Sequence, residues 1–412
     1  MGEARNTDPS AAEVAGFGLS ALPPGFTDDP YPWYRALRLH APVHRMPDGA
    51  IFLTRHADCE AVYRDTRTFS SDKRAEFAPK YGDTPLFEHH TTSLVFNDPP
   101  LHTRVRRLIA GALSPRALAD LEPGLVTLVD GLLDHMAARG EADLIEDFAA
   151  AIPIEVIGNL LGVPHADRGP LRGWSLAILG ALEPRLSPAQ EAAGNAAVTD
   201  FLAYLRDLVA DRRTHPGDPE HDVLTRLILG EADGERLSER ELLHNCIFIL
   251  NAGHETTTNL IGNGLHALTL WPGERARLVD DPALIRTAVE EMLRFESSNQ
   301  LGNRSTTAAT EIAGVALEAG TRITLCIGAA NRDPAAFAEP ERLDVGRTPN
   351  RHLAFGLGAH QCAGLSLARL EGRVALSRFL ARFPDYQLKG QPVRGGRARF
   401  RGFLSLPAQL GT

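Results

Sequence analysis

A proline-free stretch between Ser238 and Pro272 limits the folds that are open to this chain. Ser238-Glu239-Arg240-Glu241 matches a capping box, in which the serine and the glutamate three residues later close the first turn of a helix. The pattern predicts one helix of about thirty residues, roughly 45 Å long at 1.5 Å per residue. We expect a helix of this length to cross the whole molecule.

Most other segments also have helical periodicity. Apolar residues recur every three or four places from Pro99 to about Arg213, which predicts three or four packed helices. A hairpin is indicated where Pro47-Asp48-Gly49 separates Val43-His44-Arg45 from Ile51-Phe52-Leu53, and Thr321–Leu325 is a β-branched run. The sequence therefore predicts a mostly α fold with a minor β region, in one domain over residues 1–412 with an irregular lead at 1–30. The helical segments are Tyr31–His40, Leu118–Met136, Phe148–Leu161, Ala192–Leu208, Pro282–Glu296 and Ala363–Phe383.

Composition excludes several classes of protein. With 412 residues, 43% of them hydrophobic and 23% charged, the chain has a core large enough to bury a cofactor. The net charge is −9 and no basic run is present, so we expect neither a nucleic-acid surface nor an anionic-membrane surface. The first thirty residues contain no signal pattern and no bilayer-length span, and the four cysteines are scattered. These features favour an unanchored protein in a reducing cytoplasm.

Cys362 lies in the segment Phe355-Gly356-Leu357-Gly358-Ala359-His360-Gln361-Cys362-Ala363-Gly364, directly before an amphipathic helix. Glycines let the backbone turn tightly and approach a flat ligand. A cysteine at the start of a helix is favoured as the thiolate, which is the form that binds metal. Zinc or an iron–sulfur cluster would need several thiolates close together, whereas one sulfur suits haem iron. The alternative is a small buried apolar cysteine, and the glycine pattern argues against it.

The segment Asn251–Thr258 breaks a local rule, because glycine and three threonines are poor residues for the middle of a long helix. The Thr256 hydroxyl can bond the Ala252 carbonyl four residues earlier and bend the helix open, and small residues at 252 and 253 leave room for a diatomic ligand. A metalloprotease motif would need a second histidine at position 258, which is Thr258. A buried, kinked helix without chemistry is the remaining alternative.

Both segments resemble the cytochrome P450 family, soluble bacterial type. The decapeptide is similar to the haem-binding motif Phe-Gly-x-Gly-x-His-x-Cys-x-Gly at every specified position, up to Gly364. The resemblance implies that Cys362 is the axial iron ligand, that Phe355 shields its sulfur and that His360 meets a haem propionate. Ala252 to Thr256 resemble the family's Ala/Gly-Gly-x-Asp/Glu-Thr segment. By that resemblance Ala252 contacts haem, Thr256 stabilises iron-bound dioxygen and Glu255 helps relay protons from solvent.

Further cations follow from the same resemblance. His102 and Arg106 lie four residues apart, so a helix places them on one face, and they resemble the family's His-x-x-x-Arg propionate clamp. Arg304 matches a third propionate ligand by its place after the helix that bears Glu291. Glu291-Met292-Leu293-Arg294 resembles the family's Glu-x-x-Arg, a structural pair expected to hold the loop Glu339–Arg342 through buried ion pairs.

The resemblance implies a haem b monooxygenase, with the haem between the Ser238 helix and the Cys362 loop. It would insert one oxygen atom into a small-to-medium organic substrate, with electrons from NAD(P)H through a separate reductase and a ferredoxin or flavodoxin. A peroxygenase or isomerase on the same fold would not need Glu255 and Thr256, and a non-catalytic haem sensor or carrier is a second alternative. Helical spacing and family position indicate the substrate-pocket residues Leu94, Val95, Phe248, Asn251, Ser298, Asn299 and Phe403.

Overall fold

The computed structural model describes residues 8–113, 115–219, 222–232 and 235–411. The chain forms two compact units, each built from separate stretches of sequence. Unit 1 contains the residues up to Ser71 together with Asn259–Cys362 and Phe383–Gly411, and unit 2 contains Asp72–Thr258 and Ala363–Arg382. Helix α12, Glu239–Leu270, contributes residues to both units.

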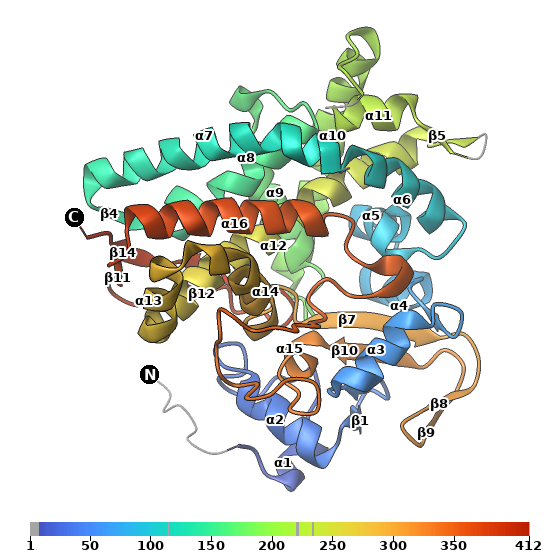
Figure 1. Cartoon of the computed structure of the whole chain (residues 1–412). Coiled ribbons are helices and arrows are strands. Elements are labelled where there is room, and N and C mark those ends of the chain that lie inside the picture. The colour runs from blue at the N-terminus through green and yellow to red at the C-terminus, as the bar shows by residue number, and fades with distance from the viewer. Residues whose placement is uncertain (1–7, 114, 220–221, 233–234, 412) are drawn as a thin grey trace. The chain divides into compact units, whose positions relative to one another are not determined.

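Unit 1 contains a five-stranded sheet with the order β1-β2-β10-β7-β3, of which Figure 1 labels β1, β7 and β10. The predicted hairpin is confirmed, because Val43 pairs with Leu53 in the antiparallel β1–β2 ladder. Strand β10 pairs in parallel with β2 and antiparallel with β7, and it confirms the strand predicted at Thr321–Leu325 with a shift of one residue. The strands are β1 Val43–Arg45, β2 Ile51–Leu53, β3 Phe69–Ser70, β7 Leu301–Thr306 and β10 Arg322–Cys326.

Two apolar clusters of unit 1 adjoin this sheet. One packs Phe17, Tyr34 and Phe52 together, and the other gathers Ile51, Leu325 and further buried side chains. The helices of unit 1 besides α12 are α1 Ala11–Ala15, α2 Tyr31–His40, α3 His56–Arg64, α13 Pro272–Asp280, η4 Pro282–Leu284, α14 Ile285–Phe295, α15 Ile327–Ala330 and η5 Gly358–His360. Its paired short strands are β8 Thr310–Ile312 with β9 Val315–Leu317, β11 Gln387–Leu388 with β14 Pro407–Gln409, and β12 Val393–Arg394 with β13 Phe403–Ser405.

The N-terminal lead, for which the sequence predicts irregular structure over residues 1–30, contains one short helix, α1. Helix α1 forms because Ser10 and Glu13 make a capping box, in which the serine side chain accepts from the Glu13 N–H at 3.4 Å. A five-residue helix has no periodicity that a pattern could detect. Residues 1–7 lie outside the described residues.

Unit 2 is predominantly helical. Figure 1 shows α7 running beside α16, and the two helices pack together. Trp174 of α9 stacks on Phe201 of α10 with ring centroids 4.9 Å apart. The helices of unit 2 besides α12 are α4 Arg74–Tyr81, α5 Pro85–Thr92, η1 Leu94–Phe96, α6 Leu101–Ala112, α7 Pro115–Arg139, η2 Ile145–Ala149, α8 Ala151–Leu160, η3 His165–Asp167, α9 Leu171–Gly180, α10 Pro188–Thr214, α11 Val223–Leu229 and α16 Leu365–Arg382, with the short strands β4 Glu141–Asp143, β5 Glu231–Ala232 and β6 Glu235–Arg236.

The predicted long helix is confirmed as α12, with 32 residues. The Glu241 N–H donates to the Ser238 hydroxyl at 3.3 Å, and the Ser238 N–H donates to the Glu241 carboxylate at 2.8 Å. The helix predicted at Phe148–Leu161 is instead divided into a π-helical turn, η2, and α8. Pro153 explains the division: it has no N–H and its ring disfavours a carbonyl four residues earlier, so the backbone widens just before it.

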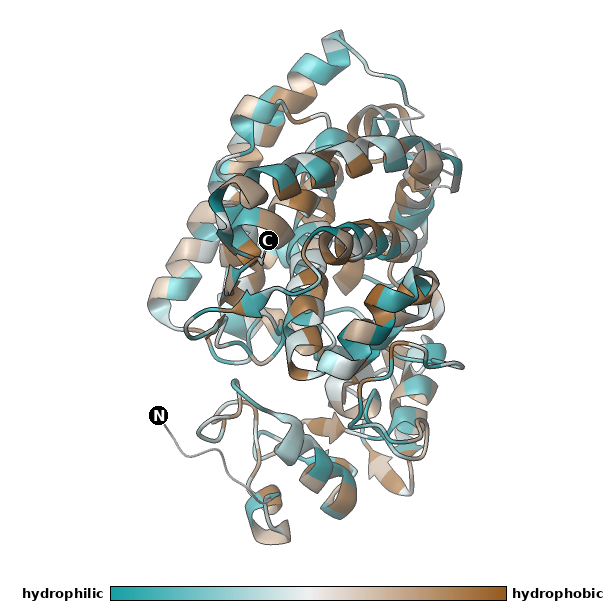
Figure 2. Cartoon of the chain, turned by 60° about the vertical axis from the view of Figure 1, so that its left-hand side comes forward, coloured by the Kyte–Doolittle hydropathy of each residue, from teal (hydrophilic) through white to brown (hydrophobic). Residues whose placement is uncertain are grey.

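Helices α6 and α14 are strongly amphipathic, and Figure 2 shows apolar and polar residues alternating along the helical ribbons. This is the pattern expected when one side of each helix is buried. Across the ranges that the structure describes, no helix is both long enough and apolar enough to cross a membrane.

Candidate active site

The loop before Cys362 is shaped by two glycines in unit 1. Gly356 and Gly358 have φ of +61° and +69°, which side chains other than glycine rarely adopt. A Cβ on Gly358 would lie 2.7 Å from the Tyr63 carbonyl oxygen, so the loop also passes too close to α3 for any other residue. The Cys362 N–H donates to the Phe355 carbonyl at 2.8 Å and closes the turn. The cysteine is thus fixed at the end of a tight loop.

Cys362 differs from the other three cysteines. Cys59, Cys246 and Cys326 are fully buried, whereas Cys362 is partly exposed. Burial raises the pKa of the Cys246 and Cys326 thiols to about 12 and that of Cys59 well above its usual value. Those three thiols stay protonated near neutral pH. Cys362 is therefore the one cysteine placed to bind a metal as a thiolate.

Three further residues predicted to contact the haem or its ligand are also in unit 1. Phe355 and His360 lie on the same partly exposed loop as Cys362. Arg304 is 7% exposed on β7, where its guanidinium lies 5.2 Å from the centre of the Tyr63 ring. Unit 1 thus contains the Cys362 loop, with Phe355 and His360, and the nearly buried guanidinium of Arg304 on β7.

The predicted oxygen-side residues lie on α12 in unit 2. The Thr256 hydroxyl donates to the Ala252 carbonyl at 2.7 Å, as the sequence predicts. Phe248, Ala252 and Thr256 follow one another at four-residue steps, and this side of the helix is partly to fully exposed. Glu255 is 5% exposed. Asn251 is 2% exposed and lies roughly 140° around the helix axis from Thr256, at 100° per residue.

His102 and Arg106 both lie on α6, so the predicted four-residue spacing does place them on one helix of unit 2. His102 is 2% exposed and Arg106 is half-buried. The same helix is held to α12 by an ion pair between Arg104 and Glu241. The helix that carries both side chains is therefore fixed to the N-terminal part of α12.

Known proteins with similar sequences and structures place the chain in a family. A family model described as Cytochrome P450 matches residues 275–393. Vitamin D(3) 25-hydroxylase of Pseudonocardia autotrophica is 39% identical over 400 residues, which are 94% of this chain and 95% of that protein. The chain belongs to the cytochrome P450 family. PikC, a P450 monooxygenase of Streptomyces venezuelae, is 38% identical over 94% of this chain and 93% of its own length.

The P450 fold is confirmed by solved structures. P450BioI, crystallised in complex with an acyl carrier protein ligated to hexadec-9Z-enoic acid, has a TM-score of 0.88 and 33% identity. The match covers 93% of this chain and 99% of that one. This P450 is accordingly an oxidoreductase of a family that includes named hydroxylases and monooxygenases.

The residues present fit the haem that the family binds. In P450s the haem iron takes one axial thiolate, and the two propionates need cationic partners. Unit 1 offers the partly exposed Cys362 on its glycine loop and the cation of Arg304. Unit 2 offers His102 and Arg106 on α6, and the side of α12 at Ala252 bears only a methyl group that would not obstruct a flat ligand.

The predicted pocket residues are distributed over both units. In unit 2, Leu94 and Val95 lie on η1, and the Leu94 N–H donates to the Asn245 side chain of α12 at 2.9 Å. In unit 1, Ser298 is buried, and Asn299 forms an isolated bridge with Phe400. The Phe403 ring packs on His266 with centroids 4.6 Å apart. Their contact with substrate stays a prediction.

The contact of Arg294 with the loop Glu339–Arg342 differs in kind from the buried ion pairs that the sequence predicts. Arg294 does hold that loop, but it donates to the backbone carbonyls of Pro340 and Arg342 at 2.8 and 3.0 Å. The Arg342 side chain is 53% exposed and pairs elsewhere. The second cation on Glu291 is Arg347, whose Nε lies 3.0 Å from a Glu291 oxygen. The predicted ion pairs are therefore wrong, because the loop meets Arg294 with its backbone carbonyls and the second cation on Glu291, Arg347, lies outside the loop.

Sequence reasoning missed Glu371, a buried residue on α16 in unit 2. It is 1% exposed, and burial raises its pKa to about 8, while a hydrogen bond with Thr257 acts in the opposite direction. Thr257 follows Thr256 on α12, so an uncharged carboxyl group lies next to the predicted oxygen-side residues. A glutamate in an amphipathic helix gives no signal of burial.

Glu371→Gln tests this protonation state. The unfolded chain loses the carboxyl proton at its ordinary pKa, whereas the folded chain keeps it until about pH 8. The wild-type free energy of unfolding should therefore fall as pH rises from 5 to 8, on the order of 2–4 kcal/mol relative to Glu371→Gln. Urea unfolding of both holoproteins across this range measures the difference. Parallel stability curves would show that Glu371 is ionised in the folded protein.

Proposed function

We propose that this P450 is a haem-thiolate monooxygenase that inserts one atom of O₂ into a small-to-medium organic substrate. The observation that carries the proposal is the partly exposed Cys362 on its glycine loop, beside three cysteines that are fully buried. Haem b supplies the iron at which dioxygen is activated. Residues 1–412 act as one P450 domain.

Each predicted residue has a role in this proposal. Cys362 ligates the iron, and Phe355 and Gly364 belong to the loop around its sulfur. Arg304, His360, His102 and Arg106 neutralise the propionates, because buried carboxylates require cationic donors. Ala252 leaves space beside the haem. The Thr256 hydroxyl holds a proton-donating water, and Glu255 passes protons to it from solvent.

Electrons come from NAD(P)H through a separate reductase and a ferredoxin or flavodoxin, in the cytoplasm. The names of the relatives support oxidation of an organic substrate: one is a vitamin D(3) 25-hydroxylase, and PikC is named a monooxygenase. Hydroxylation is the reaction we expect. A peroxygenase or isomerase would turn over without Thr256 and Glu255, and a haem sensor would give no product with any electron source.

Thr256→Ala and Glu255→Gln separate these functions. In the alanine variant no hydroxyl positions the proton-donating water. We therefore expect several-fold less product per NAD(P)H and a matching rise in hydrogen peroxide. Haem content and NAD(P)H consumption should stay normal. Glu255→Gln removes an ionisable group and should lower turnover on the order of 10²-fold, which is typical for loss of an acid–base group. The assay measures product, NAD(P)H and peroxide in parallel. Its substrate is chosen by a screen for compounds that shift the ferric haem from low to high spin.

Thr269→Ala is the matched control. Its hydroxyl also donates to a backbone carbonyl of α12, that of His266 at 2.7 Å, but near the far end of the helix. It should leave the ratio of product to NAD(P)H unchanged. Equal ratios in wild type and Thr256→Ala would contradict the role of Thr256, and turnover driven by added peroxide alone would favour the peroxygenase.

A further inference from the structure

Two buried polar side chains of α12 have no hydrogen-bond partner among the residues that the structure describes. They are Asn251, 2% exposed, and His254, 1% exposed, and both belong to unit 2. The oxygen and nitrogen of the Asn251 amide and both ring nitrogens of His254 are buried in this way. Buried polar atoms in native proteins are nearly always satisfied, by protein groups or by ordered water.

These side chains are arranged in order around the helix. At about 100° per residue, His254 lies roughly 60° to one side of Asn251, and Glu255 lies roughly 40° to the other side. Thr256 follows about 100° beyond Glu255. His254, Asn251, Glu255 and Thr256 therefore form a polar path that leads from one side of α12 to the side proposed to face oxygen.

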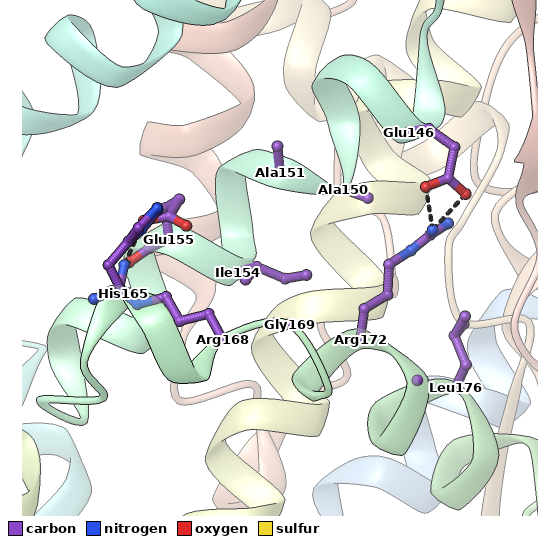
Figure 3. Close-up of a pocket in the computed structure, with 11 residues that line it drawn as sticks. Glu146, Ala150, Ala151, Ile154, Glu155, His165, Arg168, Gly169, Arg172 and Leu176 are labelled. Atoms are coloured by element: carbon purple, nitrogen blue, oxygen red, sulfur yellow. Dashed lines mark hydrogen bonds and ion pairs between the residues drawn. The ribbon is translucent and has the colours of Figure 1, made fainter.

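A groove in unit 2 lies at the outer end of this path. It has a volume of about 570 Å³ and is bounded by η2, α8 and α9. Figure 3 shows an ion pair between Arg172 and Glu146 at one end, and Ile154 separates it from the group of Glu155, His165 and Arg168 at the other end. Half of the Glu146 side chain, 54%, is exposed, so solvent reaches this ion pair.

Arg172 lines the groove, and its charge acts on His254. Its Nη1 donates to Glu146, while its Nε is buried and meets no acceptor in the described part of the chain. Burial and then the positive charge of Arg172 lower the pKa of His254 to about 3, so the ring is neutral near pH 7. Helix α8, which lines the groove, packs directly on α12 here, because a Cβ on Gly253 would lie 2.6 Å from the Ile157 side chain.

We propose that ordered water molecules bound by Arg172 Nε, His254 and Asn251 form a proton entry route from this groove to Glu255. Water fits because it both donates and accepts. Arg172 Nε can only donate, a neutral histidine has one donor and one acceptor, and the asparagine amide has both. Two or three waters with about three hydrogen bonds each would satisfy all five unpaired atoms. The role in catalysis rests on the proposed function, whereas the hydration does not.

In this route His254 and Asn251 are positioning residues. Their hydrogen bonds hold the waters in line, so that a proton from solvent near Glu146 is passed from water to water and reaches the Glu255 carboxylate. His254 itself gains no charge, because the protons move through the waters. Each proton that enters the route is matched by one that reaches Glu255. A neutral histidine suits this task, since a protonated ring would lose its acceptor.

His254→Leu tests the route in the holoenzyme. Leucine fills similar space without polar atoms, so we expect the rate of product formation to fall by at least about three-fold and the solvent deuterium isotope effect to increase, because proton supply becomes slower. His254→Gln keeps a donor and an acceptor and should restore both values to near wild type. His215→Leu, the same change at a side chain that is 78% exposed, serves as the control.

Crystals of the holoenzyme give a readout that does not depend on activity. We expect water within hydrogen-bond distance, about 2.7–3.2 Å, of both Arg172 Nε and a His254 nitrogen, and its loss in His254→Leu. A dry site in the wild type, or unchanged rate and isotope effect in His254→Leu, would overturn the proposal. If the wild type itself forms no product, the proposed function fails, and the crystal result still decides the hydration.

Discussion

We expect Arg294→Met to lower the free energy of unfolding by about 3–5 kcal/mol, because it removes one partner of a fully buried ion pair. The Arg294 and Glu291 side chains are both 0% exposed, and Arg294 Nε lies 2.7 Å from a Glu291 oxygen. The guanidinium also donates to the carbonyls of Asn331, Pro340 and Arg342, so three loop groups lose their donor together. Urea unfolding followed by far-UV circular dichroism measures the loss.

Two further arginines make this experiment specific. Arg347→Met removes the second cation on Glu291 and should cost about 2–4 kcal/mol, since Glu291 keeps Arg294. Arg342→Met makes the same chemical change a few residues away, where the side chain is 53% exposed, and should cost less than about 1 kcal/mol. Equal losses at Arg342 and Arg347 would contradict the network described here. Arg347→Met remains informative if Arg294→Met does not fold.

Secondary-structure elements that depend on a few neighbouring residues could be predicted from the sequence. The Ser238–Glu241 capping box gave the start of α12, and the Pro47-Asp48-Gly49 turn fixed the register of β1 and β2. The π-helical turn Ile145–Ala149 was not predicted, because the apolar periodicity of Phe148–Leu161 continues through Pro153 without a break. The short helix α1 was not predicted either, because its five residues show no periodicity beyond a single capping box.

The site divides in the same way. Cys362, with its glycines, was predictable because a tight loop and a lone thiolate need those residue types at that spacing. Arg347 lies 56 residues from Glu291, so nothing local distinguishes it from Arg342. His254 and Glu371 were not predicted to be buried polar groups, since burial depends on helices that are distant in sequence.

The central claim is that Cys362 ligates haem iron as a thiolate, and the reduced carbon-monoxide complex tests it most directly. Thiolate donation shifts the Soret band of this complex to the red of the position that histidine ligation gives. Cys362→His should therefore move the band to the position seen in globins. No other cysteine can replace Cys362, because Cys59, Cys246 and Cys326 are fully buried.

The measurement is the absorption spectrum of freshly reduced, folded holoenzyme under carbon monoxide, recorded for wild type, Cys362→His and a Cys246→Ser control. The account predicts the red-shifted band in wild type and Cys246→Ser, and the globin-like band in Cys362→His. A globin-like band in the wild type, or a red-shifted band that survives in Cys362→His, would contradict it.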